Sequence, residues 1–195
     1  ASALALDAVR GDFDVPVMGV VIPGARAAVE ATRNRKVGVG GTDATVQSGM
    51  YTKVIHEMAP DVTVIEKACP LFVPLVEEGF KDHIVTQEII EYYLESMRSS
   101  DIDAMILGCT HYPLLRSKIR EYMGEKIQIV NPAYETAMDL KKLLHELELE
   151  NGGETDRCSR YSFYVSDAAE KFRRFANTVM PFDVPTTNVV NIEEY

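Results

Sequence analysis

The chain has 195 residues, a formal net charge of -10 and 46% hydrophobic residues. At about 150 residues per domain, this length predicts one large or two small domains, with enough apolar residues to build a core. The acidic balance argues against a protein that binds nucleic acid or an anionic membrane, because both need a basic face. No apolar run approaches the roughly 18 residues of a membrane-spanning helix.

The number of cysteines and the identity of the first residue indicate the cellular compartment and whether upstream sequence is missing. Three cysteines, an odd and small number, do not form a disulfide framework. We therefore expect a reducing, cytoplasmic environment. The chain begins at Ala1 rather than at a methionine and shows no secretory signal pattern. A first predicted helix at 2–10 has no strand before it, so we expect upstream sequence to be missing.

Apolar runs and helical patterns alternate along the chain. Helices and strands are predicted, in chain order, as helix 2–10, strand 15–22, helix 24–33, strand 36–39, helix 43–58, strand 62–65, helix 86–97 with Thr86 as N-cap, strand 104–107, a helix opened by Pro113, strand 127–130, helix 134–150, strand 161–165 and a helix to about 178. The strands are apolar throughout, which is typical of a parallel sheet covered on both faces. The sequence therefore predicts a doubly wound α/β fold, with a polar loop at 151–160.

The most specific chemical signal is the segment 107–113 (LGCTHYP), at the end of an apolar strand. In open α/β sheets, ligands bind at the carboxyl ends of the strands. Cys109 would lie near a helix N-terminus that favours its thiolate, and His111 could exchange a proton with it. Thr110 could bind an anionic ligand. The alternative for Cys109 is a buried structural thiol, which is common for free cysteines.

A second strand end is the segment 38–45 (GVGGTDAT). It lacks the glycine spacing of a dinucleotide-binding loop, because Asp43 takes the place of the third glycine. Thr42 and Thr45 either cap the following helix or form a small carboxylate pocket.

The third strand end is the segment 68–79 (ACPLFVPLVEEG). Cys69 precedes a proline in an apolar setting, so we expect an inert, packed thiol there. Glu77 is either a solvated edge residue or a carboxylate that orients a base. The chain has no C-x-x-C or H-x-x-x-H pattern, so no metal site is expected, and Cys158 has no obvious partner.

Five segments, in this order, resemble the glutamate racemases of the aspartate/glutamate racemase superfamily. They are VPVMGVVIPGA (15–25), KVGVGGTDATVQSGMY (36–51), ACPLFVPLVEEG (68–79), MILGCTHYPLLR (105–116) and QIVNPAYETA (128–137). The fourth is similar to the motif that carries the family's second cysteine. The similarity covers most of residues 1–180, and the combination is far more specific than any one motif.

The resemblance implies a cofactor-independent isomerase that interconverts L- and D-glutamate and supplies D-glutamate for peptidoglycan. In this family two cysteines act on opposite faces of the substrate: one thiolate removes the Cα proton, and the other thiol reprotonates the opposite face. The residues that the resemblance implies are Cys109 as the second cysteine, His111 as its assistant, Thr110, Thr42 and Thr45 as substrate-binding groups, and Glu77 as a supporting carboxylate. Family members are commonly dimers, so a homodimer is implied for the intact protein.

The sequence also departs from the family pattern. The family's first cysteine lies in a Cys-Asn-Thr-Ala motif, and residues 1–5 match only the residues that come after that motif's threonine. We therefore expect that this chain alone does not racemise glutamate at an appreciable rate. Gly40 stands where the family usually carries a bulkier aliphatic residue.

The family architecture is a pair of similar doubly wound α/β domains, each with a parallel sheet, that face each other across the substrate. Its match to this chain implies one complete domain at 22–130 and one partial domain, the late portion of the other, at 1–21 plus 131–195.

Two alternatives remain open. One is an aspartate or hydantoin racemase of the same superfamily, although related aspartate racemases tend to carry an acidic residue where His111 stands. The other is a non-catalytic binding module, a truncated racemase. Alkylation separates the second from an enzyme, because an active-site Cys109 should react with iodoacetamide and be protected by glutamate.

Overall fold

A computed structural model describes residues 2–151 and 161–194. They divide into two compact units, Ala1–Glu150 and Asn151–Tyr195, each of which is considered by itself. None of the helices in the described ranges is long and apolar enough to cross a membrane.

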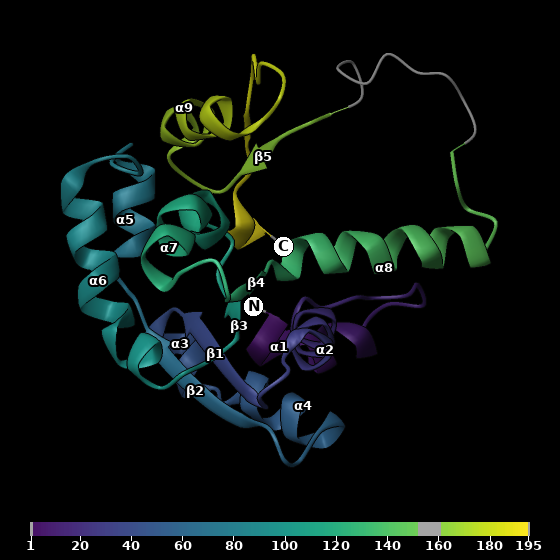
Figure 1. Ribbon diagram of the computed structural model, residues 1–195. Coiled ribbons are helices and arrows are strands. Elements are labelled where there is room, and N and C mark those ends of the chain that lie inside the picture. The colour runs from purple at the N-terminus through teal and green to yellow at the C-terminus, as the bar shows by residue number, and fades with distance from the viewer. Residues whose placement is uncertain (1, 152–160, 195) are drawn as a thin grey trace. The chain divides into compact units, whose positions relative to one another are not determined.

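The first unit is built on a four-stranded sheet in which every paired strand is parallel (Figure 1). Its strands are β1 (Lys36–Gly41), β2 (Thr63–Ala68), β3 (Ala104–Leu107) and β4 (Gln128–Val130), in the order β2-β1-β3-β4. Its helices are α1 (Ser2–Gly11), α2 (Val21–Ala31), α3 (Asp43–Gln47), α4 (Met50–Met58), α5 (Phe72–Glu77), α6 (Ile84–Ser99), α7 (Arg116–Met123) and α8 (Pro132–Glu146), with a 3-10 turn η1 (Tyr112–Leu115).

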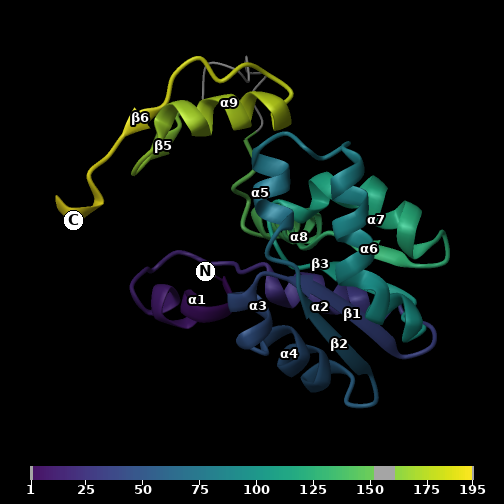
Figure 2. The same ribbon diagram turned by 90° about the vertical axis from the view of Figure 1, so that its left-hand side faces the viewer.

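Helices cover both faces of this sheet (Figures 1 and 2). Val37 and Val39 of β1 point to one face, where they share a fully apolar core with α2 and α4. Gly38, between them, points to the other face, where a Cβ atom would lie 2.5 Å from Ile102 and 3.3 Å from Met97 of α6. This alternation places α2 and α4 on one side and α6, with α7 packed against it, on the other. The predicted doubly wound architecture is confirmed.

The predicted strand at 15–22 is wrong. Residues 15–20 have no regular structure, and α2 begins at Val21. Pro23 is compatible with this helix because the first-turn N–H groups have no partner within the helix, so a proline there loses no helical hydrogen bond.

Three helix boundaries also differ from the prediction. The helix expected at 43–58 is divided by Gly49, whose φ of 58° suits glycine and which serves as the N-cap of α4. The N-cap of α6 is His83, whereas Thr86 is buried and donates its hydroxyl hydrogen to the carbonyl of Phe80 at 2.6 Å. Pro113 opens the 3-10 turn η1, and α7 follows it.

The second unit contains a short parallel pair, β5 (Tyr164–Val165) and β6 (Asn188–Val189), and the helix α9 (Ala169–Val179). The expected strand at 161–165 is therefore reduced to its last two residues. The tail from 181, expected to be irregular, contains β6 and a 3-10 turn at Ile192–Glu194. Cys158 and residues 152–160 of the expected loop lie outside the described residues.

The predicted boundaries after residues 21 and 130 fall inside the first unit. There β4 leads through Asn131 into α8, which packs against α2. The assignment of 22–130 to one domain and of 1–21 plus 131–195 to another remains a prediction.

Asp103 stabilises the edge of the sheet at which the strands begin. This edge is opposite the carboxyl edge, where the polar residues follow the strands. Its carboxylate accepts hydrogen bonds from the Thr32 hydroxyl at 2.5 Å and from the backbone N–H groups of Arg33 and Asn34 at 2.8 and 2.9 Å. Partial burial raises the pKa of Asp103, but these hydrogen bonds outweigh it and hold the pKa below its usual value of 3.8.

Asp103→Ala should lower the free energy of unfolding by about 2 kcal/mol at neutral pH, because three donors lose a charged acceptor. The folded-state pKa lies below the unfolded one, so this stabilisation is present above pH 3.8 and disappears as the pH falls further. Urea titrations should therefore show the wild-type and variant curves converging at low pH. Asp61→Ala, which removes an exposed partner of Arg35, is the control and should cost less than about 0.5 kcal/mol. An equal loss in Asp103→Ala at neutral pH and at a pH well below 3.8 would contradict this account.

Candidate active site

The loops after the four strands meet at the carboxyl edge of the sheet. The Cys69 N–H donates to the Gly41 carbonyl at 2.9 Å, and the Gly108 N–H donates to the Gly40 carbonyl at 2.8 Å. The buried Tyr112 hydroxyl lies 2.8 Å from the Gly41 carbonyl oxygen and 2.7 Å from the Cys69 carbonyl oxygen. These contacts fix the ends of β1 and β2 against the loop that follows β3.

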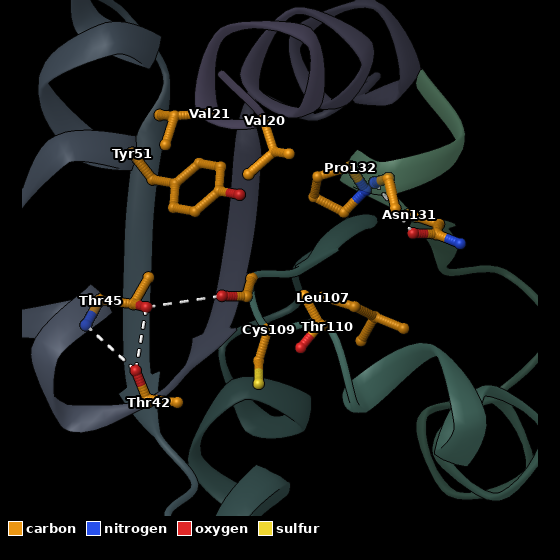
Figure 3. Close-up of a pocket in the computed structure, with 12 residues that line it drawn as sticks. Val20, Val21, Thr42, Thr45, Tyr51, Leu107, Cys109, Thr110, Asn131 and Pro132 are labelled. Carbon is orange, nitrogen blue, oxygen red and sulfur yellow. Dashed lines mark hydrogen bonds between the residues drawn. The ribbon is translucent and has the colours of Figure 1, made fainter. Parts of the chain in front are cut away.

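A pocket with a volume of about 340 Å³ opens at this edge (Figure 3). Its lining residues are Val20, Val21, Thr42, Thr45, Tyr51, Leu107, Gly108, Cys109, Thr110, Asn131, Pro132 and Ala133. They come from the ends of β1, β3 and β4, from α3 and from the starts of α2, α4 and α8. None of these twelve side chains is charged.

Thr42 and Thr45 both line the pocket, and Thr42 is also the N-cap of α3. The Thr42 hydroxyl accepts a hydrogen bond from the Thr45 N–H at 3.3 Å, and the two hydroxyl oxygens lie 3.0 Å apart. The Thr45 hydroxyl also lies 3.5 Å from the Gly108 carbonyl. The capping role is thus confirmed, and the same hydroxyl pair faces the pocket.

Cys109 and Thr110 line the pocket, whereas His111 stands next to it and pairs with Glu77. The His111 Nε2 atom lies 3.3 Å from a Glu77 carboxylate oxygen, and its Nδ1 lies 3.1 Å from the Thr110 hydroxyl. Glu77 is the last residue of α5. This pair therefore links the segment 68–79 to the segment 107–113. Cys109 itself precedes the 3-10 turn η1 rather than an α-helix, so the expected helix-dipole effect on its thiol is small.

The loop that carries Cys109 lies very close to β1, and this closeness requires glycine at 108. A Cβ atom there would lie 3.1 Å from the Gly40 carbonyl oxygen and 3.2 Å from a ring carbon of Tyr51. A side chain at this position would require the loop or β1 to shift by a few tenths of an ångström.

Cys69 is fully buried and is not part of the pocket. Its thiol lies 3.6 Å from the Lys67 carbonyl, and burial raises its pKa to about 12. The prediction of an inert, packed thiol is consistent with both observations. Across the described residues, no group of three or more His, Cys, Asp or Glu side chains is placed to hold a metal ion.

Sequence reasoning missed the side of the pocket away from Cys109. The apolar run at 15–22 predicts a strand that contains Val20 and Val21. The helix predicted at 43–58 does not include Tyr51 among its apolar positions. The spacing of Tyr51 to Val54 and Ile55 is the signal that would have placed it inside. The sequence predicts Asn131 as a turn residue. It also follows a strand end and lines the pocket.

Fold and site together define an α/β protein with a parallel sheet and a cysteine in a small-molecule pocket at its carboxyl edge. The chain belongs to the Asp/Glu/hydantoin racemase family, whose model matches residues 1–139. It is 42% identical over 177 residues to the glutamate racemase of Geobacter metallireducens, an isomerase.

Solved structures agree with this assignment. The chain resembles the crystal structure of the glutamate racemase isoform RacE1 from Bacillus anthracis, with a TM-score of 0.91, 33% identity and 98% of this chain covered. It also resembles the glutamate racemase of Francisella tularensis, solved in complex with D-glutamate, with a TM-score of 0.89, 30% identity and all of this chain covered.

The chain spans only part of these proteins. The match to the Geobacter protein includes 91% of this chain but 65% of that protein, and the chain covers 70% and 71% of the Bacillus and Francisella chains.

The two described cysteines should differ sharply in alkylation. Iodoacetamide at mildly alkaline pH should modify Cys109, which lines the pocket, much faster than Cys69, whose pKa of about 12 leaves almost no thiolate. Peptide mapping by mass spectrometry after a short exposure measures both sites in one sample. Cys69→Ser should leave the rate at Cys109 unchanged, and equal labelling of both sites in the folded protein would contradict the assignment.

Proposed function

We propose that this protein carries one half of the proton-transfer machinery for interconverting L- and D-glutamate, with Cys109 as the proton carrier on one face of the substrate. The observation that carries the proposal is the Cys109 thiol in an uncharged pocket beside hydroxyl groups, in a chain related to glutamate racemases. The structure with D-glutamate bound belongs to such a relative and supports glutamate as the substrate.

In the proposed reaction, the Cys109 thiolate removes the Cα proton of glutamate and becomes a thiol. The electron pair left on Cα moves into the α-carboxylate, and a second carrier returns a proton to the opposite face. Thr110 and the Thr42–Thr45 pair would donate hydrogen bonds to that carboxylate, where negative charge accumulates.

The hydroxyl pair can supply one such bond by giving up only its weakest contact. Its two hydrogens serve the Thr42–Thr45 contact and the Gly108 carbonyl, and the latter contact is long at 3.5 Å. A carboxylate beside Thr42 would reverse the chain of hydrogen bonds, so that Thr45 donates to Thr42 and Thr42 donates to the ligand. Only the weak bond to Gly108 is then exchanged.

Glu77 and His111 would act as a unit behind Cys109. A carboxylate oxygen 3.3 Å from Nε2 fixes the orientation of the imidazole, and the Thr110 hydroxyl lies 3.1 Å from the other ring nitrogen. Such a ring can assist proton transfer at the thiol or the substrate. By family resemblance, the reaction takes place in the cytoplasm, serves peptidoglycan synthesis and uses a homodimer.

The 195-residue chain should exchange the Cα proton of L-glutamate for deuterium in D2O, with retention of configuration. Of the cysteines in the described part of the chain, only Cys109 lines the pocket, and a single thiol can return a deuteron only to the face it deprotonated. Proton NMR measures the loss of the Cα signal, and circular dichroism measures inversion.

Cys109→Ser should abolish exchange, while Cys69→Ser should retain it. Inversion at a rate equal to exchange would contradict the need for a second carrier on the opposite face. No exchange above the uncatalysed rate would overturn the proposed function for this chain.

Glu77→Gln should slow the exchange about tenfold, or about 1.4 kcal/mol in the barrier, because it keeps the shape of the pair with His111 but removes its charge. Glu78→Gln, at the next and exposed position, is the matched control and should have no effect. Exchange rates by NMR at saturating L-glutamate test this. Equal rates in both variants would exclude a role for the Glu77–His111 pair.

A further inference from the structure

The Tyr112 hydroxyl connects the three strand ends that carry groups of the proposed site. It donates its hydrogen to the carbonyl oxygens of Gly41 and Cys69, which lie at 2.8 and 2.7 Å. Gly41 directly precedes Thr42, and Cys69 begins the segment that leads through α5 to Glu77. One hydroxyl group therefore joins the loop after β3 to the ends of β1 and β2.

Cys109 lies between two anchors. The Gly108 N–H donates to the Gly40 carbonyl at 2.8 Å, and the Tyr112 hydroxyl follows Cys109 by three residues. The Tyr112 N–H also donates to the Cys109 carbonyl at 3.2 Å, so the backbone and the side chain of Tyr112 restrain the same short turn. Cys109 and Thr42 line the pocket from different strand ends (Figure 3). The separation between the thiol and the Thr42 hydroxyl thus depends on how these strand ends are joined.

The fold can keep this arrangement of carbonyl groups without the Tyr112 hydroxyl. The Cys69 N–H also donates to the Gly41 carbonyl at 2.9 Å, and the Phe72 N–H donates to the Cys69 carbonyl at 3.1 Å. The buried Tyr112 ring packs edge to face on Phe72, a contact that does not involve the hydroxyl. Removal of the hydroxyl therefore leaves neither carbonyl without a partner, while the link from the loop after β3 is lost.

The link is present throughout the neutral pH range. Burial raises the pKa of Tyr112 above its usual value, so the hydroxyl keeps its hydrogen. Its acceptors are backbone carbonyl groups, which do not titrate in this range. A measurement near neutral pH therefore reports on the intact link.

We propose that Tyr112 is a positioning residue for proton transfer at Cys109. Its hydroxyl sets the separation between the thiol and the Thr42–Thr45 pair, so that one glutamate reaches the thiol with its Cα and the hydroxyl groups with its α-carboxylate. This inference rests on the proposed function and adds to it a residue that does not line the pocket.

Loss of the link should affect the chemical step more than the binding of glutamate. Proton transfer depends steeply on the alignment of the reacting atoms, and a misplacement of about 1 Å can cost about 100-fold in rate. Hydrogen bonds from hydroxyl groups to a carboxylate tolerate a broader range of geometry. The expected signature is therefore a lower kcat with little change in KM.

Tyr112→Phe in the 195-residue chain tests this role. Exchange of the Cα proton of L-glutamate in D2O, followed by proton NMR over a range of concentrations, gives kcat and KM. The variant should lower kcat about tenfold, while KM stays within about twofold. Iodoacetamide should modify Cys109 at a rate within about twofold of wild type, because alkylation needs an accessible thiolate but no alignment with a second group.

Tyr93→Phe is the matched control. Tyr93 also packs edge to face on Phe72, with 5.6 Å between centroids, and its hydroxyl contacts the backbone of Leu71. The substitution removes a tyrosine hydroxyl from the same aromatic cluster but leaves the link from Tyr112 in place. It should therefore behave as wild type in kcat, KM and alkylation rate.

An unchanged kcat in Tyr112→Phe overturns the positioning role. A rise in KM as large as the fall in kcat indicates a generally loosened pocket and overturns it as well, and so does a tenfold change in Cys109 alkylation, which places the effect on the thiol itself. Rapid alkylation of the buried Cys69 shows that the variant does not fold and also overturns it. These outcomes leave the proposed function intact, whereas a wild-type chain without exchange overturns both.

Discussion

The hydroxyl of Tyr112 holds the site together, because it lies between the carbonyl oxygens of Gly41 and Cys69, at the ends of β1 and β2. Its ring is fully buried and meets Phe72 edge to face, with 5.0 Å between centroids. Since Tyr112 follows Cys109 by three residues, one side chain fixes the reactive loop against two strands. Tyr112 is also the first residue of the 3-10 turn η1, so the anchor and the turn belong to one segment.

Cys69 and Cys109 show how position at the edge of a sheet decides the chemistry of a thiol. Both follow a strand of the same sheet, and both precede a short turn. Cys69 is covered completely, so its charged form is disfavoured and its pKa rises to about 12. Cys109 opens into the pocket, because Gly108 lets its loop lie against β1. Strand-end placement is therefore necessary but not sufficient for a reactive cysteine.

Secondary structure and site residues are predicted best from the sequence where contacts are local and burial is complete. The strand Ala104–Leu107 is predicted with its observed bounds, because four apolar residues end at a glycine. The segment 15–22 is equally apolar, but the start of α2 at its end depends on packing against α8, which no local pattern encodes. Likewise, Thr42 and Cys109 follow from their positions at strand ends, whereas Tyr51 joins the pocket only through tertiary contacts.

Under the proposed function, oriented neutral groups would bind an anionic amino acid, because no charged side chain lines the pocket. A buried Lys or Arg would add charge but would also carry a desolvation cost and could neutralise the thiolate needed for proton removal. Hydroxyl groups and helix N-termini supply partial positive charge that is fixed by the fold. In the proposed reaction, the negative charge that accumulates in the α-carboxylate when Cα is deprotonated would strengthen each of these bonds. Binding and catalysis can thus rely on the same donors, with the larger gain in the transition state.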